Sequence, residues 1–233
     1  MAVEQEKIWR MFDRIAAHYD KANRVLSWGQ DQYWRSILAD RLPKDKPLAV
    51  LDIATGTADL LLNMCELRPN IKQAIGIDLS ENMLDYGRQK VAKTKYQITL
   101  KTGDATNLDF SDNSFDVVSI AFGIRNVVDF KQALKEIARV VKPDGQALIL
   151  EFSLPANVMI KYGYLAYFRH ILPLIGGIIS KDRDAYRYLN RTVESFPYAK
   201  AFSDLLIKAG FSSIKEQQLC CGIAMLYEAR VNA

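Results

Sequence analysis

Strand-like and helix-like segments alternate between residues 48 and 152, and this alternation constrains the fold more than any other feature of the chain. The apolar runs LAVLDIA and FDVVSIAFG lack polar–apolar alternation, as expected of strands that are buried on both faces. The segments between such runs carry apolar residues at helical spacing. The predicted order, β-α-β-α-β-β-α-β with short links, indicates an α/β fold whose mostly parallel sheet has helices on both faces.

Turn and capping residues bound these predicted elements. Ser80 is a suitable N-cap, because its hydroxyl can accept from a free N–H of the first helical turn. Pro143, Asp144 and Gly145 predict a turn before the last strand of this region. We expect strands over 48–54, 71–78, 96–102, 115–123 and 146–152, and helices over 58–67, 80–93 and 129–141.

Two helices are predicted before this region. Ile8, Met11, Phe12, Ile15 and Ala16 lie on one face of an amphipathic helix. A second helix is predicted over 31–42, ending before Pro43, and residues 18–29 between the two are expected to be irregular.

The pattern changes again after Phe152. Residues 154–197 are rich in aromatic side chains and predict an inserted helical segment. A helix over 199–209 ends at Gly210, and the strands over 214–219 and 222–228 follow each other so closely that we expect an antiparallel pair at one sheet edge. We therefore predict one domain over 1–233, with an N-terminal helical cap (1–46), a cofactor-binding core (47–152), a helical lid (153–197) and a C-terminal helix and strand pair (198–233).

Composition excludes several classes of protein. Apolar residues make up 49% and charged residues 25% of the chain, which opposes disorder. The net charge of +4 is spread without a basic tract, so nucleic acid is not an expected partner. Cys65, Cys220 and Cys221 form no disulfide framework, and His18 and His170 have no partner at metal-ligand spacing, so no metal is expected.

The N-terminus predicts a cytoplasmic location. It is charged throughout and lacks the apolar stretch of a signal peptide. In the apolar part of the C-terminal half, the charge-free stretch over residues 171–180 is far shorter than a membrane span requires.

Candidate ligand-binding residues follow three of the predicted strands. In open α/β sheets, ligands bind beyond the carboxyl ends of the strands. Gly56 lets the backbone approach a ligand, Asp78 can accept from two ribose hydroxyls, and Asp104 can accept from an exocyclic amine such as that of adenine. The alternatives are a simple turn at Gly56, an acid at the start of a helix at Asp78, and an ordinary loop residue at Asp104.

The glycine turn itself distinguishes between nucleotide classes. A dinucleotide fingerprint needs three glycines, whereas here Ala54 and Ala58 stand near the other two places. The turn is therefore poorly built for a pyrophosphate. A nucleoside site without a phosphate cradle matches S-adenosylmethionine.

Three further stretches carry a resemblance to a known family. They are YDKANRVLSWGQDQYW (19–34), FGIRNV (122–127) and RVVKPDGQALILEFS (139–153). With LDIATGTAD, GIDLS and GDA, they make the chain similar to class I S-adenosylmethionine-dependent methyltransferases and, more narrowly, to the ubiquinone/menaquinone biosynthesis C-methyltransferases (UbiE/MenG). The resemblance covers almost the whole chain. The family usually has Met at Ala22, His at Asp31 and Gly at Asp144.

The resemblance implies a Rossmann-like fold with an antiparallel C-terminal edge strand and a helical cap, and S-adenosylmethionine as cofactor. It implies C-methylation of a demethylated prenyl quinol, with demethylmenaquinol favoured and the ubiquinol precursor as a further acceptor. The alternatives are another small hydrophobic or polar acceptor, a nicotinamide dehydrogenase, which the missing glycines oppose, and a non-catalytic S-adenosylmethionine-binding module.

The resemblance also implies roles for individual residues. The cofactor would contact Asp52, Thr55, Gly56, Thr57, Asp78, Leu79, Met83, Asp104, Ala105, Ala121, Phe122 and Gly123. The quinol would contact Tyr19, Asn23, Trp28, Asn126, Tyr186 and Tyr188, whereas Trp34 is expected in the core.

Two residues are the catalytic candidates. Arg125 can lower the pKa of a quinol hydroxyl or hold its oxyanion, and the alternative is an arginine that ties down its loop. Asp31, in place of His, can act as a base, and its role is left open. Glu151 also ends a strand, but it can equally pair with a neighbouring Arg, and it receives no catalytic role.

The lid contains an apolar stretch that suits a lipid substrate. Its aromatic and aliphatic residues, from Tyr162 to Ile175, are interleaved with Lys161 and Arg169. They predict an interfacial helix that contacts the membrane surface and lets a prenyl tail leave the bilayer. A packed cap over the site and a homodimer face are equal alternatives.

Overall fold

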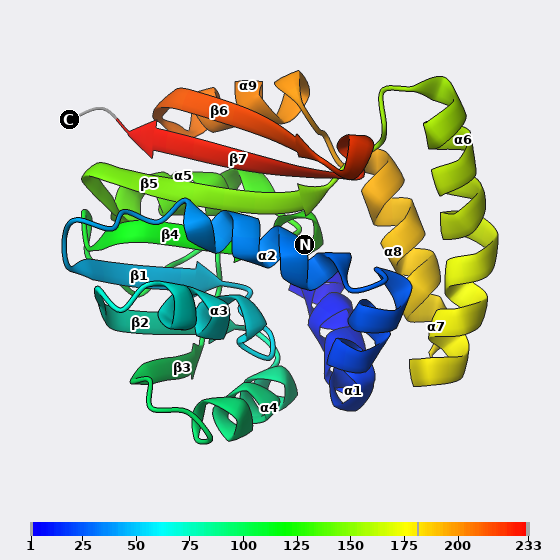
Figure 1. Cartoon of the computed structure of the whole chain (residues 1–233), viewed down its shortest axis with the longest axis horizontal. Coiled ribbons are helices and arrows are strands. Elements are labelled where there is room, and N and C mark those ends of the chain that lie inside the picture. The colour runs from blue at the N-terminus through cyan, green and yellow to red at the C-terminus, as the bar shows by residue number, and fades with distance from the viewer. Residues whose placement is uncertain (1, 181, 232–233) are drawn as a thin grey trace.

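The central element of the structure, a computed structural model that describes residues 2–180 and 182–231, is a seven-stranded sheet (Figure 1). The sheet order is β3-β2-β1-β4-β5-β7-β6, with β1 to β5 parallel and β7 antiparallel to both of its neighbours. This confirms the mostly parallel sheet with an antiparallel pair at its C-terminal edge. The strands are β1 (Leu48–Ile53), β2 (Ile71–Asp78), β3 (Ile98–Thr102), β4 (Phe115–Ala121), β5 (Val141–Phe152), β6 (Phe211–Leu219) and β7 (Ala224–Val231). Met1 and residues 232–233, at the ends of the expected cap and C-terminal part, lie outside the described residues.

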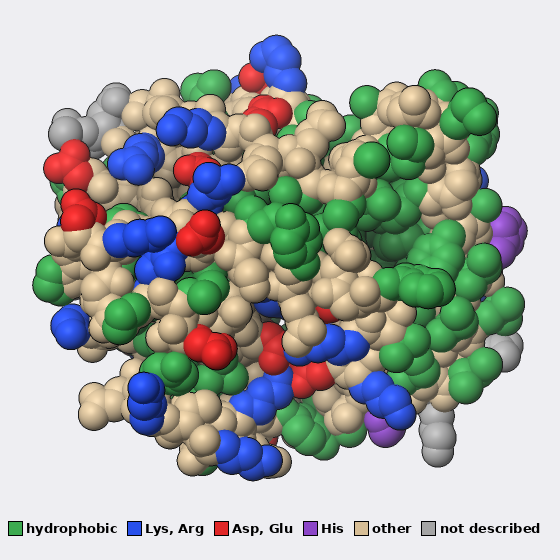
Figure 2. Space-filling model, in the orientation of Figure 1, with side chains coloured by type: hydrophobic (Ala, Val, Ile, Leu, Met, Phe, Trp, Pro, Cys, Tyr) green, Lys and Arg blue, Asp and Glu red, His purple; other side chains and the backbone are tan. Residues whose placement is uncertain are grey.

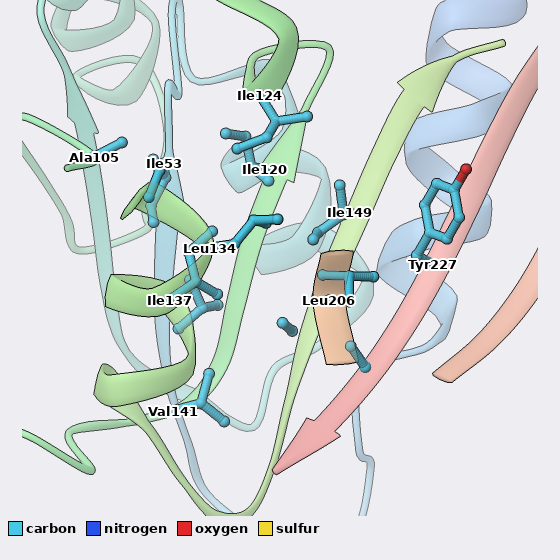
Figure 3. Packing of buried hydrophobic residues seen from close by; sticks show 14 of the residues in the cluster. Ile53, Ala105, Ile120, Ile124, Leu134, Ile137, Val141, Ile149, Leu206 and Tyr227 are labelled. Carbon is cyan, nitrogen blue, oxygen red and sulfur yellow. The ribbon is translucent and has the colours of Figure 1, made fainter. Parts of the chain in front are cut away.

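Helices cover both faces of the sheet. One face packs against α2 (Gln30–Asp40), α3 (Asp59–Leu67) and α4 (Glu81–Val91), and the other against α5 (Phe130–Val140) and α9 (Lys200–Ala209). Figure 3 shows Leu134 and Ile137 of α5 and Leu206 of α9 over Ile120 and Ile149 of the central strands. The central strands β1 and β4 are buried on both sides, which explains why their sequences lack alternation.

Capping side chains define where the helices of the core begin. Ser80 Oγ accepts a hydrogen bond from the N–H of Met83, and Asp129 accepts one from the N–H of Gln132. These contacts satisfy N–H groups of the first helical turn, which have no partner within the helix. The Ser80 cap is therefore confirmed, and α9 ends at Gly210 as expected.

The prediction of irregular structure over 18–29 is wrong. Helix α1 (Ala2–Leu26) continues through this segment, and only three residues separate it from α2. The reason is tertiary packing. Ala22 and Leu26 continue the apolar stripe of Met11 and Ile15, and all four lie buried against the lid.

The structure has no separate turn at Pro143–Gly145, where the sequence predicted one. These residues lie within β5, as an irregularity in its pairing with β4. Asp144 has a φ of 64°, in the left-handed region that favours glycine and that Asp tolerates better than most residues. This backbone conformation explains why the similar family usually has glycine at this position.

The helical insertion is confirmed. Helix α6 (Val158–Ala166), the π-helical turn η2 (Tyr167–Ile171) and α7 (Leu172–Ser180) form one continuous rod, residues 158–180, and α8 (Arg183–Ser195) returns beside it. Figure 1 shows this rod at the right edge of the molecule, with α8 and α1 between it and the sheet. Tyr164, Phe168 and Leu172 of the rod pack on α1 in a core of their own. None of the helices in the described ranges combines the length and hydropathy that crossing a membrane requires.

Candidate functional site

A cavity of about 700 Å³ lies at the carboxyl ends of β1, β2, β3 and β4, and we refer to it as the strand-end cavity. It lies where β1 has β2 on one side and β4 on the other, the place where open α/β sheets bind ligands. The structure brings together there many of the residues that the sequence proposed for the cofactor: Gly56, Asp78, Leu79, Met83, Asp104, Ala105, Ala121, Phe122 and Gly123.

Asp78 presents to this cavity a carboxylate that is anchored through both of its oxygens. Its Oδ2 accepts from the N–H of Gly56 at 2.8 Å, and its Oδ1 accepts from the N–H of Ser80 at 2.9 Å. Burial raises the pKa of Asp78, and these two N–H groups oppose the rise. Each oxygen keeps a lone pair for a further donor, such as a ribose hydroxyl.

Asp104 presents a second carboxylate to the same cavity. Its Oδ1 accepts from both the N–H and the hydroxyl of Thr106, each at 2.8 Å. In the described part of the chain, no protein donor reaches Oδ2. The carboxylate is therefore oriented by its own loop and keeps one oxygen for an amine.

Of the residues expected to contact the cofactor, three do not line the cavity: Asp52, Thr55 and Thr57. Asp52 is buried behind the turn, where it accepts from Thr55 Oγ1 at 2.7 Å and from Ser119 Oγ at 2.6 Å. Burial raises its pKa to about 6. Asp52 lies one residue before the end of the central strand β1, so its side chain points into the packed interior on one face of the sheet. Asp52 therefore supports the turn from behind.

The turn after β1 holds three residues in the left-handed region. Ala54, Gly56 and Ala58 have φ values of 51°, 55° and 64°. Only glycine adopts this region without strain, so the two alanines store a small amount of backbone strain at the cavity. The same conformation brings the N–H of Gly56 onto Asp78.

Helix α1 covers the cavity, at the place expected of the N-terminal cap, but its residues were not predicted to line the cavity. Gln5, Ile8, Trp9 and Phe12 of α1 line the strand-end cavity. The apolar stripe that predicted the helix was the available signal, but periodicity alone does not distinguish a cavity wall from a core face. α1 is tied down by polar contacts: Thr57 Oγ1 donates to Asp20 at 2.6 Å, and Lys90 bridges Asp20 and Asp59 at 2.5 Å each.

A second cavity, of about 890 Å³, lies between α1, α2 and the lid, and we call it the apolar cavity. Its walls include Met11 and Ile15 of α1 and Phe168 and Leu172 of the rod. Phe12, Tyr19 and Phe122 line both cavities, so the two adjoin each other at these side chains. Figure 2 shows a recess with hydrophobic side chains over α8, between α2 and the rod.

Arg125 lies in the wall of the apolar cavity. Its Nη1 donates to Glu151 Oε1 at 2.6 Å and to the carbonyl of Phe122 at 2.6 Å. Its Nε is buried and has no hydrogen-bond partner among the residues that the structure describes. The pairing considered for Glu151 is found, and Arg125 both anchors its loop and keeps donor capacity.

The chain matches the model of the ubiE/COQ5 methyltransferase family over residues 1–230. This chain belongs to that family. It is 43% identical over 224 residues to the ubiquinone/menaquinone biosynthesis C-methyltransferase UbiE of Geotalea daltonii, with 95% of each chain covered. It is 37% identical over 226 residues to the demethylmenaquinone methyltransferase of Porphyromonas gingivalis, covering 96% of this chain and 92% of that one. The chain is therefore an S-adenosylmethionine-dependent methyltransferase.

Solved structures with low sequence identity share the fold of this chain. An S-adenosylmethionine-dependent methyltransferase of Thermotoga maritima matches with a TM-score of 0.69 at 19% identity, covering 96% of this chain and 99% of that one. The [4+2]-cyclase SpnF matches with a TM-score of 0.63 at 16% identity, covering 87% and 82%. A cyclase on the same scaffold shows that the fold does not fix the reaction.

Among the residues predicted to contact the quinol, Tyr19, Asn23, Tyr186 and Tyr188 line the apolar cavity. Trp28 does not. It lies in the turn between α1 and α2 with a φ of 56° and is 83% exposed, so its side chain points to the surface. Asn126 lines the strand-end cavity instead, since η1 (Ile124–Asn126) turns it away from Arg125. Trp34 is buried as expected, but it also lines the apolar cavity.

Asp31 lies in the apolar cavity, but its carboxylate is already engaged. Its Oδ2 accepts from Arg24 at 2.5 Å and from Arg35 at 2.7 Å, and its Oδ1 accepts from Ser27 Oγ at 2.8 Å. Both oxygens of Asp31 thus already accept hydrogen bonds from protein donors. This arrangement opposes a role for Asp31 as a base. Arg35, which the sequence analysis did not single out, is the residue that Asp31 positions.

Proposed function

We propose that this chain transfers a methyl group from S-adenosylmethionine to a ring carbon of a demethylated prenyl quinol, with demethylmenaquinol as the acceptor. The observation that carries this proposal is the pair of adjoining cavities. One presents two carboxylates suited to a nucleoside, and the other is apolar and contains a buried arginine. The names of relatives such as the Porphyromonas gingivalis enzyme support the choice of acceptor.

The residues of the strand-end cavity fit the cofactor. Asp78 accepts from the ribose hydroxyls, and Asp104 accepts from the adenine amine, while Leu79, Met83 and Ala105 supply apolar surface for the base. The absence of a glycine-rich phosphate cradle agrees with a ligand that has no phosphate. When bound, S-adenosylmethionine supplies a methyl group that is activated by its positive sulfur.

The residues of the apolar cavity orient and activate the acceptor. Arg125 holds the quinol oxygen next to the accepting carbon and favours its ionised form, which makes that carbon nucleophilic. Tyr186 and Tyr188 of the lid close the cavity around the ring, and the apolar walls exclude water. The ring carbon gains the methyl group as the sulfur–methyl bond breaks, and its proton then passes to a weak base or a held water.

A calorimetric titration followed by a methylation assay tests this proposal. Purified protein is titrated with S-adenosylmethionine and then assayed with a demethylated naphthoquinol and a demethylated benzoquinol of equal prenyl length. We expect binding, and methylation of the naphthoquinol in preference. Binding without methylation of either quinol would contradict the acceptor class, and no binding would contradict the assignment of the strand-end cavity.

Arg125→Lys tests the role of the arginine. It keeps the charge opposite Glu151 but loses the buried Nε donor. We expect kcat to fall by about 100-fold, while the affinity for S-adenosylmethionine changes by less than about three-fold. An unchanged kcat would leave Arg125 as a loop anchor only.

We further propose that the outer face of the rod rests on an anionic lipid surface. Val158, Met159, Tyr162, Leu174 and Ile178 are exposed along this face. Residues 154–181 contain no Asp or Glu, and their charged side chains are all basic. An exposed apolar stripe with basic residues is typical of helices that lie in the membrane interface. The apolar cavity lies directly beneath, lined by the rod's own Tyr164, Phe168 and Leu172.

Vesicle sedimentation tests this contact. We expect the protein to sediment with vesicles of phosphatidylglycerol and phosphatidylcholine, and Met159→Asp/Ile178→Asp to remain in the supernatant. Lys72→Asp, an exposed charge change on β2, serves as the control. Concentration-dependent dimerisation that these aspartates abolish, without vesicle binding, would favour the homodimer face instead.

A further inference from the structure

Arg35 is a second buried cation in the apolar cavity. It lies on α2 and is only 8% exposed, among aromatic and aliphatic walls. Among the described residues that line this cavity, only Asp31, Arg35 and Arg125 are charged. A guanidinium remains charged at any accessible pH, so its presence in an apolar space requires partners for its N–H groups.

Both arginines of this cavity are anchored by one nitrogen and leave others without a partner. Arg35 Nη1 donates to Asp31 at 2.7 Å, as Arg125 Nη1 donates to Glu151 at 2.6 Å. Within residues 2–180 and 182–231, neither Nε nor Nη2 of the two arginines has a hydrogen-bond acceptor. Two cations with unused donors thus line one apolar space, and Arg35 also borders a polar pocket with Arg24 and Asp59.

The two guanidiniums lie over different rings of one aromatic pair. Arg35 lies 5.6 Å from the centroid of Phe122, and Arg125 lies 5.2 Å from that of Phe152. The two rings are 4.5 Å apart and tilted by 36°. Burial raises the pKa of Tyr19, which lines both cavities, and the two guanidiniums oppose the rise.

We propose that Arg35 binds the second ring oxygen of the acceptor, so that a 1,4-quinol is held by one arginine at each oxygen. This inference rests on the proposed function and assigns the oxygen next to the accepting carbon to Arg125. A ring with oxygens at opposite ends satisfies donors of both cations, whereas a ring with one oxygen leaves one cation unpaired. The preference for the ring with two oxygens is strong, because a buried polar group without a hydrogen-bond partner costs binding free energy.

Two acceptors that differ by a single oxygen test this role. The first is a naphthohydroquinone with a short prenyl chain, and the second is the prenyl naphthol that lacks the hydroxyl farther from the accepting carbon. Each is assayed for methylation with wild type, Arg35→Gln and Arg35→Lys, and its binding is measured by calorimetry. Affinity for S-adenosylmethionine and the melting temperature report whether each variant is folded.

Arg24→Gln is the matched control. Arg24 also donates to Asp31, at 2.5 Å, but it does not line the apolar cavity. Both substitutions remove one guanidinium from the same carboxylate, so an effect through Asp31 alone would be shared by the two variants.

We expect Arg35→Gln to lower kcat/KM for the hydroquinone by about 10- to 100-fold, mainly through KM, and for the naphthol by less than about three-fold. Arg35→Lys should recover part of the loss, and Arg24→Gln should affect both acceptors equally. An equal loss for both acceptors in Arg35→Gln would show that Arg35 only supports the structure and would overturn the proposal.

Failure of the proposed function gives a different result. In that case wild type binds S-adenosylmethionine but methylates neither acceptor. The calorimetric comparison still decides the inference, since a second-oxygen site predicts tighter binding of the hydroquinone than of the naphthol, with the difference lost in Arg35→Gln. Equal binding of the two compounds by wild type would overturn it.

Discussion

Two carboxylates at the ends of adjacent parallel strands have different surroundings and different roles. Asp78 ends β2, opens onto the strand-end cavity and is held by two backbone N–H groups. Asp52 of β1 is enclosed by the sheet and held by two hydroxyls. The first is thus available to a ligand, whereas the second supports the turn on which the ligand rests.

Substitution of Asp78 is predicted to weaken cofactor binding. Asp78→Asn keeps the size of the side chain but removes a charged acceptor and places an N–H₂ group opposite Gly56 or Ser80. We expect the Kd for S-adenosylmethionine to rise by about 10- to 100-fold in a calorimetric titration. Glu81→Gln, on the exposed start of α4, is the control and should bind normally. An unchanged Kd for Asp78→Asn would remove Asp78 from the binding site.

Asp52 is predicted to make the stability depend on pH. Because its pKa is raised to about 6, the folded state holds this proton more tightly than the unfolded chain does. The contribution of Asp52 to stability is therefore fully present below about pH 4 and falls as the pH rises to about 6. As the pH rises from about 4 to about 6, the free energy of unfolding of Asp52→Asn should increase relative to that of wild type by on the order of 2–3 kcal/mol. Denaturant titrations at several pH values measure this difference. A pH-independent difference between the two proteins would contradict the raised pKa.

At the scale of elements, the lid depends on a close contact between α7 and α8. Gly176 of α7 faces the ring of Tyr186 of α8, and an added Cβ would lie 2.6 Å from ring atoms. Glycine is required here by proximity, since a methyl group would force one of the two helices to move. Tyr186 also lines the apolar cavity, so this contact shapes the wall of the acceptor site.

Gly176→Ala is predicted to destabilise the protein and to raise the KM for the quinol. We expect a loss of about 1–3 kcal/mol in the free energy of unfolding, because the ring of Tyr186 must be displaced. Gly163→Ala in α6 is the control, since nothing lies within 4 Å of its added Cβ. This control should leave stability unchanged or raise it by up to about 1 kcal/mol. Equal effects of the two substitutions in thermal unfolding would rule out the steric explanation.

At the scale of the whole molecule, α1 connects the sheet to the lid. It covers the strand-end cavity, lines the apolar cavity and packs on the rod. Its contacts to the turn after β1 run through Asp20, which accepts from Thr57 and from Lys90. Access to both cavities therefore depends on one helix, and cofactor binding should stabilise it.

Hydrogen exchange is predicted to report this closure. We expect S-adenosylmethionine to slow amide exchange in residues 8–20, and Lys90→Met to speed it by about five-fold, since a bridging ion pair of about 1 kcal/mol is lost. Lys93→Met is the control, because Lys93 makes no ion pair within the described ranges. Exchange in α1 that is insensitive to the cofactor would show that α1 does not close over it.

The sequence by itself determined the periodic features of this protein. Apolar runs and capping residues such as Ser80 established the strands, the helices of the core and the place of the ligand at the strand ends. These features are local, because helix and strand periods are set by residues a few positions apart. The resemblance carried by FGIRN and its companion segments supplied the family.

Only the tertiary structure decided which side chains face which cavity. Asp31 is engaged by Arg24 and Arg35, Trp28 points to the surface, and α1 extends to Leu26 because the lid, more than 100 residues away, covers it. Ion pairs and burial depend on chain segments that meet only in the fold, so no local pattern encodes them. For the same reason Arg35, which lies on an ordinary amphipathic helix, becomes a buried cation in the apolar cavity only when α2 packs beside Phe122.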